Sequence, residues 1–143
     1  MVELAIILPM LLIVLIAIIE LGFILYDKAV ITNASREGAR KGIIYRTIGN
    51  PGVYHPYTEA EIKGVVDAYL EDPDNSAWHI LIPRDAAHSV TTVQGSICPG
   101  NAANPLTVRV AYTYNFVILP NLVTSIIGPI NLIGETTMRC DFD

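Results

Sequence analysis

A run of uncharged, mostly apolar residues near the N-terminus most constrains what this chain can fold into. From Leu4 to Ile19 the sequence reads LAIILPMLLIVLIAII, and beyond Glu20 the apolar character continues to Tyr26. A helix rises about 1.5 Å per residue, so residues 2–26 would extend roughly 36 Å, enough to cross a bilayer core of about 30 Å. Because such a helix is apolar on every face, it is not an ordinary amphipathic surface helix.

Three interpretations of this segment compete: a cleaved signal peptide, a permanent membrane anchor, and a helix that leaves the membrane to pack among copies of itself. A signal peptide is disfavoured, because the start is acidic, the run is long and no small-residue cleavage site follows Gly22. For an anchor, the flanking bases lie only on the C-terminal side, which by the positive-inside tendency leaves residues 27–143 in the cytoplasm. A preceding basic leader would reverse this orientation, so we expect a processed product.

The charged residues divide the chain into segments of opposite sign. Residues 1–26 carry a net charge of −2, residues 27–46 of +3 and residues 47–143 of −6, within an overall charge of −5. An acidic outer segment disfavours nucleic acid as a general partner, because phosphate contacts need clustered lysine and arginine. The 52% of apolar residues and the modest net charge exclude disorder for most of the chain. We therefore expect a stem helix (residues 1–48), of which residues 1–26 lie in a membrane or filament core, and a globular head (residues 49–143).

Two glutamates within or beside the apolar run need an explanation, since a charge at the centre of a membrane helix costs about 2.5–3.5 kcal/mol. Glu3 either reaches the interface from the helix end or meets the free α-amino group of a neighbouring chain's Met1, a pair that would set the axial register between stems. Glu20 is too far from Lys28 for a pair within one helix. It either faces water near the membrane edge or pairs with a basic residue of another chain.

Prolines and small residues along the stem indicate where the helix bends and where it packs closely. Pro9 should bend or loosen the helix, because it lacks an N–H and crowds a carbonyl in the preceding turn, and Gly22 is a second weak point. Small residues then recur at every fourth position: Ala34, Gly38 and Gly42. This stripe packs either under the head of its own chain or against the helix of another chain. Both alternatives predict that the helix continues over residues 27–46.

The head is predicted to be α+β. A cluster of helix breakers at residues 49–57 marks its boundary with the stem. Thr58 and Glu61 have capping-box spacing and predict a second helix, with an apolar face formed by Ile62, Val65, Val66 and Tyr69, that ends near Glu71. Alternating patterns then predict strands at residues 78–82, 89–97, 106–117 and 130–140. One buried and one wetter face favour an antiparallel sheet, covered by the second helix and the C-terminal half of the stem helix.

Motifs for catalysis or metal binding are absent from the sequence. Cys98 and Cys140 are the only cysteines, and a lone pair at this separation has no metal-site spacing. They either form a disulfide in an oxidising compartment, worth about 3–4 kcal/mol in the chain-entropy model, or remain as two buried thiols. No HExxH, phosphate-binding loop, nucleophile elbow or CxxC occurs. We therefore expect no enzyme activity, cofactor or metal.

Several short motifs occur together in an order known from one family. They are VELA at residues 2–5, LP at 8–9, IELG at 19–22, TNASREGAR at 32–40, NPLTVRV at 104–110 and ETTMR at 135–139. Together they resemble the TadE-like proteins of the tight-adherence (Tad) pilus system, in which the fourth motif typically contains Asn-Ala-x-Arg-Glu-Gly-Ala-Arg. The resemblance covers both ends of the chain and leaves the middle unconstrained.

This resemblance implies a type IV pilin-like subunit that is held in the cytoplasmic membrane before assembly with its head outside. It also implies removal of a basic leader by a prepilin peptidase. The family's glutamate role carries onto Glu3, which stands third here and not fifth as in usual processed pilins. TadE-like proteins are usually regarded as minor pilins, and the motifs leave open whether this chain builds the shaft.

With this resemblance, we expect a structural subunit of an extracellular type IV (Tad-like) pilus filament, used for adhesion or surface attachment. Its partners would be copies of itself, other pilins, the assembly machinery and, on the precursor, the peptidase. The residues expected to serve assembly are Met1, Glu3, Pro9, Glu20, Gly22, Ala34, Gly38 and Gly42. One alternative is a minor pilin or a membrane-anchored assembly or priming factor that stays in the cytoplasmic membrane. Another is a binding module whose loop at residues 98–105 or 118–129 contacts a surface.

Overall fold

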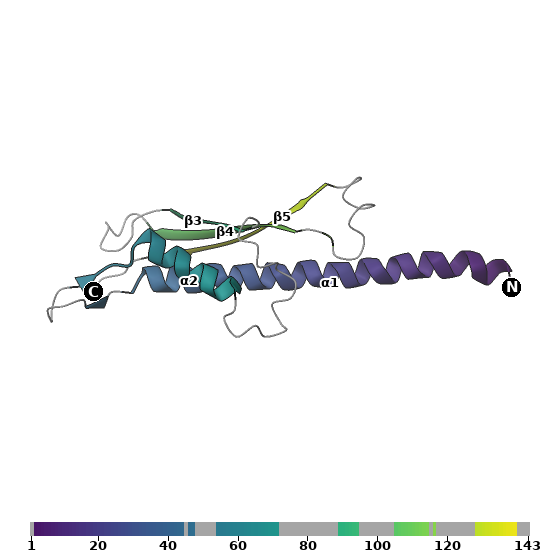
Figure 1. Cartoon of the computed structure of the whole chain (residues 1–143), viewed down its shortest axis with the longest axis horizontal. Coiled ribbons are helices and arrows are strands. Elements are labelled where there is room, and N and C mark those ends of the chain that lie inside the picture. Colours follow the sequence, from purple (N-terminus) through teal and green to yellow (C-terminus); the bar gives the residue numbers. More distant parts are fainter. Residues whose placement is uncertain are drawn as a thin grey trace.

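One long helix runs through the molecule, and the second helix and the three-stranded sheet lie along its C-terminal half (Figure 1). The computed structural model of the chain describes residues 2–44, 46–47, 54–71, 89–94, 105–114, 116 and 128–139. The N-terminal half of the helix extends beyond the other described elements. The arrangement confirms the predicted α+β class, with a long apolar helix followed by a second helix and an antiparallel sheet.

Helix α1 spans Val2–Gly42 and continues through both Pro9 and Gly22. Its end comes four residues earlier than the predicted continuation to residue 46. The last turn is closed by backbone bonds from the Ile43 amide to the Ala39 carbonyl (3.3 Å) and from the Ile44 amide to the Lys41 carbonyl (3.2 Å). Glycine and β-branched residues at this point favour the helix less than the residues before them, which accounts for the earlier end.

The second helix, α2, spans Glu59–Glu71 and begins with the predicted capping box. The Thr58 amide donates to the Glu61 carboxylate (2.8 Å), and the Glu61 amide donates back to the Thr58 hydroxyl (3.4 Å). Its buried face consists of Ile62, Val66 and Leu70, spaced at one helical turn. The assignment of Tyr69 to this face was wrong, because its side chain is 39% exposed and Leu70 points inward in its place.

The sheet has three antiparallel strands in the order β3-β4-β5. Alternate residues of the central strand are buried, as its sequence pattern predicts. A separate two-stranded ladder pairs β1 with β2, which no sequence pattern had indicated. The strand expected at residues 78–82 lies outside the described residues. The strand bounds are Arg46–Thr47 for β1, Tyr54–His55 for β2, Ser89–Gln94 for β3, Leu106–Tyr114 for β4 and Ile130–Met138 for β5.

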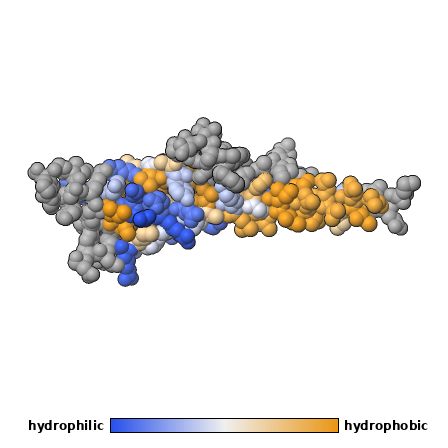
Figure 2. Space-filling model, turned by 90° about the horizontal axis from the view of Figure 1, so that it is seen from below, coloured by the Kyte–Doolittle hydropathy of each residue, from blue (hydrophilic) through white to orange (hydrophobic). Residues whose placement is uncertain are grey.

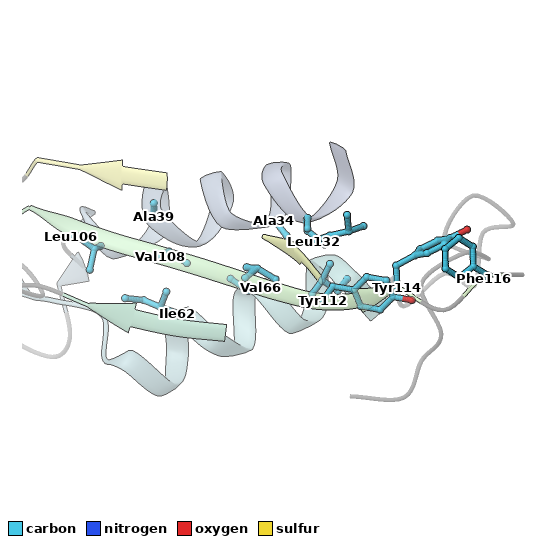
Figure 3. Packing of buried hydrophobic residues seen from close by; sticks show 13 residues of the cluster. Ala34, Ala39, Ile62, Val66, Leu106, Val108, Tyr112, Tyr114, Phe116 and Leu132 are labelled. Carbon is cyan, nitrogen blue, oxygen red and sulfur yellow. The ribbon is translucent and has the colours of Figure 1, made fainter. Parts of the chain in front are cut away.

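The hydrophobic core lies between the sheet and the two helices. Helix α1 packs against β4 and β5, and α2 packs against α1 and β3. Figure 3 shows the labelled side chains of both helices pointing toward the central strand β4. This confirms the expected covering of the sheet by α2 and the C-terminal half of α1. The helix that leads out of the head is therefore also one wall of its core.

Candidate functional site

Apolar side chains are exposed all around the first turns of α1. The exposed apolar segment, as we call residues 4–19, has large aliphatic side chains open to solvent on every face, for example Met10 at 72%. Figure 2 shows it as a continuous orange surface, whereas blue gathers over the head. The helix is long and apolar enough to cross a membrane. Monomeric soluble proteins rarely expose contiguous apolar surface of this extent, so the segment is suited to a lipid or protein environment.

The exposed apolar segment ends at Glu20, whose carboxylate is turned into the head. Its side chain is only 5% exposed and accepts a hydrogen bond from the Tyr114 hydroxyl (2.8 Å), so it does not face water. From the sequence, its expected partner was either water or a basic residue of another chain. The structure corrects this with a tyrosine of the same chain. From Glu20 onward, one face of α1 is buried in the chain's own fold, with Glu20, Asp27 and Ile31 on it.

A second carboxylate, Asp27, follows Glu20 by seven residues, two helical turns, and therefore lies on the same face of α1. It is fully buried, and neither of its carboxylate oxygens has a hydrogen-bond partner. Burial raises its pKa from the ordinary value of 3.8 to about 6. The pKa of Tyr112 is raised to about 12, mainly by burial and secondly by the negative charge of Asp27. The pKa of Tyr114 is raised by burial first and then by its hydrogen bond to Glu20.

The stripe of small residues lies within the chain's own fold. Its three members, Ala34, Gly38 and Gly42, are all buried. A methyl group added at Gly38 would lie 2.6 Å from Cγ2 of Val66 on α2, and one added at Gly42 would meet the side chain of Leu106 on β4. Of the two interpretations left open by the sequence, the structure shows packing under the head of the same chain. These residues have no exposed surface to offer to another helix.

Strand β5 is held on α1 by close backbone approach and polar contacts. The Cβ of an alanine at Gly134 would lie 2.6 Å from the carbonyl oxygen of Ile31, so glycine is required for this approach. The Lys28 ammonium donates to the Ile133 carbonyl. Two residues beyond Gly134, the hydroxyls of Thr136 and of Ser35 on α1 are hydrogen-bonded at 2.8 Å. The sequence did not predict these contacts, because periodic patterns indicate which face is buried but not which residues meet across 100 positions.

The N-terminal region of the chain, which includes most of α1, is similar to a known protein family. Residues 1–40 match the family model described as TadE-like protein. The match confirms, over these residues, the resemblance inferred from the sequence motifs. It contains the exposed apolar segment, Glu20 and Asp27, and it ends two residues before the end of α1. No curated protein and no solved structure matches the chain.

Residues 1–40, which we call the TadE-like segment, are thus similar to the family that the sequence motifs also resemble. The segment includes Glu3 and Met1, but their side chains are not among those that the structure describes, and their pairing between chains stays a prediction. Cys98 and Cys140 also lie outside the described residues, so the disulfide is untested. Pro9 and Gly22 are placed within α1, and no atom lies within 4 Å of a methyl group added at Gly22. Among the residues that the structure describes, no group of three metal-ligating side chains comes together.

Proposed function

We propose that this chain is a structural subunit of an extracellular Tad-like pilus filament, assembled by packing of its N-terminal helices. One observation carries the proposal: the TadE-like segment contains an apolar surface that the described elements of the head leave uncovered. Complete burial of one large aliphatic side chain contributes about 1.5–3 kcal/mol. The sixteen residues of the exposed apolar segment are therefore strongly stabilised when they are removed from water, either into lipid or against other helices.

Both environments have a place in the proposed sequence of events. Before assembly, residues 2–19 would cross the cytoplasmic membrane, since 18 helical residues extend about 27 Å, within the range of known spans. A prepilin peptidase would act on the precursor, and the head would lie outside the cell. On assembly, the same surface would be buried against stems of other subunits, with the acidic heads displayed outward. The assembly partners are then copies of this chain, other pilins and the assembly machinery.

Within the proposed filament, Glu3 sets the register between stems through the α-amino group of Met1 on a neighbouring chain. The Glu3→Ala variant should be incorporated into fibres at least about tenfold less, because a charge pair in low dielectric loses one partner and leaves the other buried. The measurement is the amount of subunit in fibres sheared from cells, relative to the membrane fraction. The matched control is Glu135→Ala, an exposed glutamate on β5. Normal incorporation of the Glu3 variant, with a folded head, would remove Glu3 from the proposal.

The alternative function is a minor pilin or membrane-anchored assembly factor, favoured by the fact that the exposed apolar segment fits lipid as well as it fits other helices. Top-down mass spectrometry of sheared fibres and of the membrane fraction separates the two. Abundance in the fibres supports the filament subunit, whereas trace amounts there, with most of the protein in membranes, support the alternative. The same masses report the mature N-terminus, and a loss of two hydrogens would reveal the disulfide between Cys98 and Cys140.

A further inference from the structure

Asp27 is an exception among the carboxylates that the structure describes. Its relative exposure is 0%, and both carboxylate oxygens are buried without a hydrogen-bond partner. Glu20, on the same face of the helix, receives a hydroxyl donor. An unpartnered carboxylate of this kind is expensive to bury in its ionised form, by several kcal/mol even after relaxation of the surroundings. The site is therefore compatible with a neutral acid and poorly compatible with an anion.

The groups that face Asp27 offer no compensating positive charge. From β4, Tyr112 and Tyr114 lie close enough for the charge of Asp27 to raise the pKa of both hydroxyls. On α1 itself, Glu20 lies two turns away and is bonded to Tyr114, while the neighbouring Lys28 donates to a β5 carbonyl.

The other described elements packed here also bring no charge to the site. The stretch of β5 that contacts α1 at this level is formed by Ile133 and Gly134, which are not ionisable. Helix α2 meets α1 farther along, at Gly38, through apolar side chains. The described residues around Asp27 therefore supply no positive charge to offset the burial of its carboxylate.

We propose that Asp27 is a protonation-controlled latch between α1 and β4. With the neutral acid, the end of β4 that bears the two tyrosines stays docked on the helix. With the anion, this end separates from α1 so that water reaches the carboxylate. The latch is a property of the isolated chain and does not depend on whether the chain forms filaments.

The raised pKa of Asp27 determines whether the folded state becomes more or less stable as the pH rises. The carboxyl ionises near pH 3.8 in the unfolded chain and at about 6 in the folded one, so between these values the folded state binds more protons. The stabilisation that the folded state gains from the Asp27 carboxyl is therefore fully present below pH 3.8 and is lost as the pH rises toward 6. The ratio of folded to unfolded chain should fall by about tenfold per pH unit, or on the order of a hundredfold in total.

The experiment uses the full chain in a non-ionic detergent and follows unfolding from about pH 3.5 to about pH 8, a range that brackets both pKa values. The wild type should lose stability over this range by the stated factor, and Asp27→Asn should lose this dependence, because its side chain stays neutral. Glu135→Gln, at an exposed position, is the matched control and should keep the wild-type dependence. An unchanged dependence in Asp27→Asn, or its disappearance in Glu20→Gln alone, would overturn the proposal.

Two further measurements report the latch itself. Hydrogen exchange in residues 106–114 should be faster in the wild type than in Asp27→Asn at about pH 7.5 and equal in the two at about pH 4. Equal exchange at both pH values contradicts the separation of β4. Titration of a ¹³C-labelled Asp27 carboxyl in the wild type does not depend on the variants' folding. A midpoint near 6 supports the proposal, and a midpoint near 3.8 refutes it.

Discussion

The Gly134→Ala variant should unfold with a free energy about 3 kcal/mol below that of the wild type, the largest effect we expect from the addition of one methyl group. The new Cβ would lie 2.6 Å from the Ile31 carbonyl oxygen and 2.9 Å from the Thr32 nitrogen, inside any allowed contact. Both are backbone atoms of α1 and have no rotamer through which to move away. The strand itself must therefore lift from the helix, at the expense of the packing around it.

The matched control is Gly64→Ala, a glycine in the interior of α2 with no atom within 4 Å of the added methyl group. It should be stabilising by about 0.5–1 kcal/mol, because alanine favours the helix more than glycine does. Both variants are measured by denaturant unfolding of the full chain in the same detergent. Equal stability of the Gly134 variant and the wild type would show that β5 lies farther from α1 than described.

Tyr114→Phe should lower the free energy of unfolding by about 1–3 kcal/mol. The ring and its packing against Phe116 are kept, with the ring centroids 5.7 Å apart, and only the hydroxyl that donates to Glu20 is removed. The cost comes from a buried carboxylate that loses this donor. Tyr69→Phe, at a position 39% exposed, is the control and should change stability by less than about 0.5 kcal/mol.

A double-mutant cycle tests whether this effect belongs to the contact between the two side chains. We expect Tyr114→Phe and Glu20→Gln to be non-additive, with a coupling of about 1 kcal/mol, since the two residues share one hydrogen bond. Strict additivity would mean that the hydroxyl acts through something other than Glu20. The cycle uses the same unfolding measurement.

The sequence predicted those features of the fold that depend on local patterns. Alternation along Leu106–Tyr114 identified the buried face of β4, and the spacing of Thr58 and Glu61 identified the start of α2. The apolar run indicated a long helix but not its end at Gly42, where a weak helix former meets β-branched residues. The short ladder of β1 and β2 was missed because two-residue strands carry too little pattern to detect.

The candidate site was less accessible to sequence reasoning. Glu20 and Tyr114 are 94 positions apart, and periodicity indicates that a residue faces inward without indicating which residue it meets. For Glu20, the apolar surroundings led to an expectation of water or another chain, whereas the head supplies the donor. Asp27 lies just beyond the apolar run, where the sequence pattern indicates nothing about its burial. Its burial results from tertiary packing, which no local signal in the sequence reports.

The continuity of α1 has a mechanical consequence. The helix passes without interruption from the exposed apolar segment into the core of the head, where it packs against β4 and β5. A tensile load applied to residues 4–19 is therefore transmitted along the helix axis and acts as shear on contacts that lie side by side. Contacts loaded in shear break together, whereas the contacts of a head joined to its stem by a loop would break one after another. The head would resist extraction from its own stem as one cooperative unit.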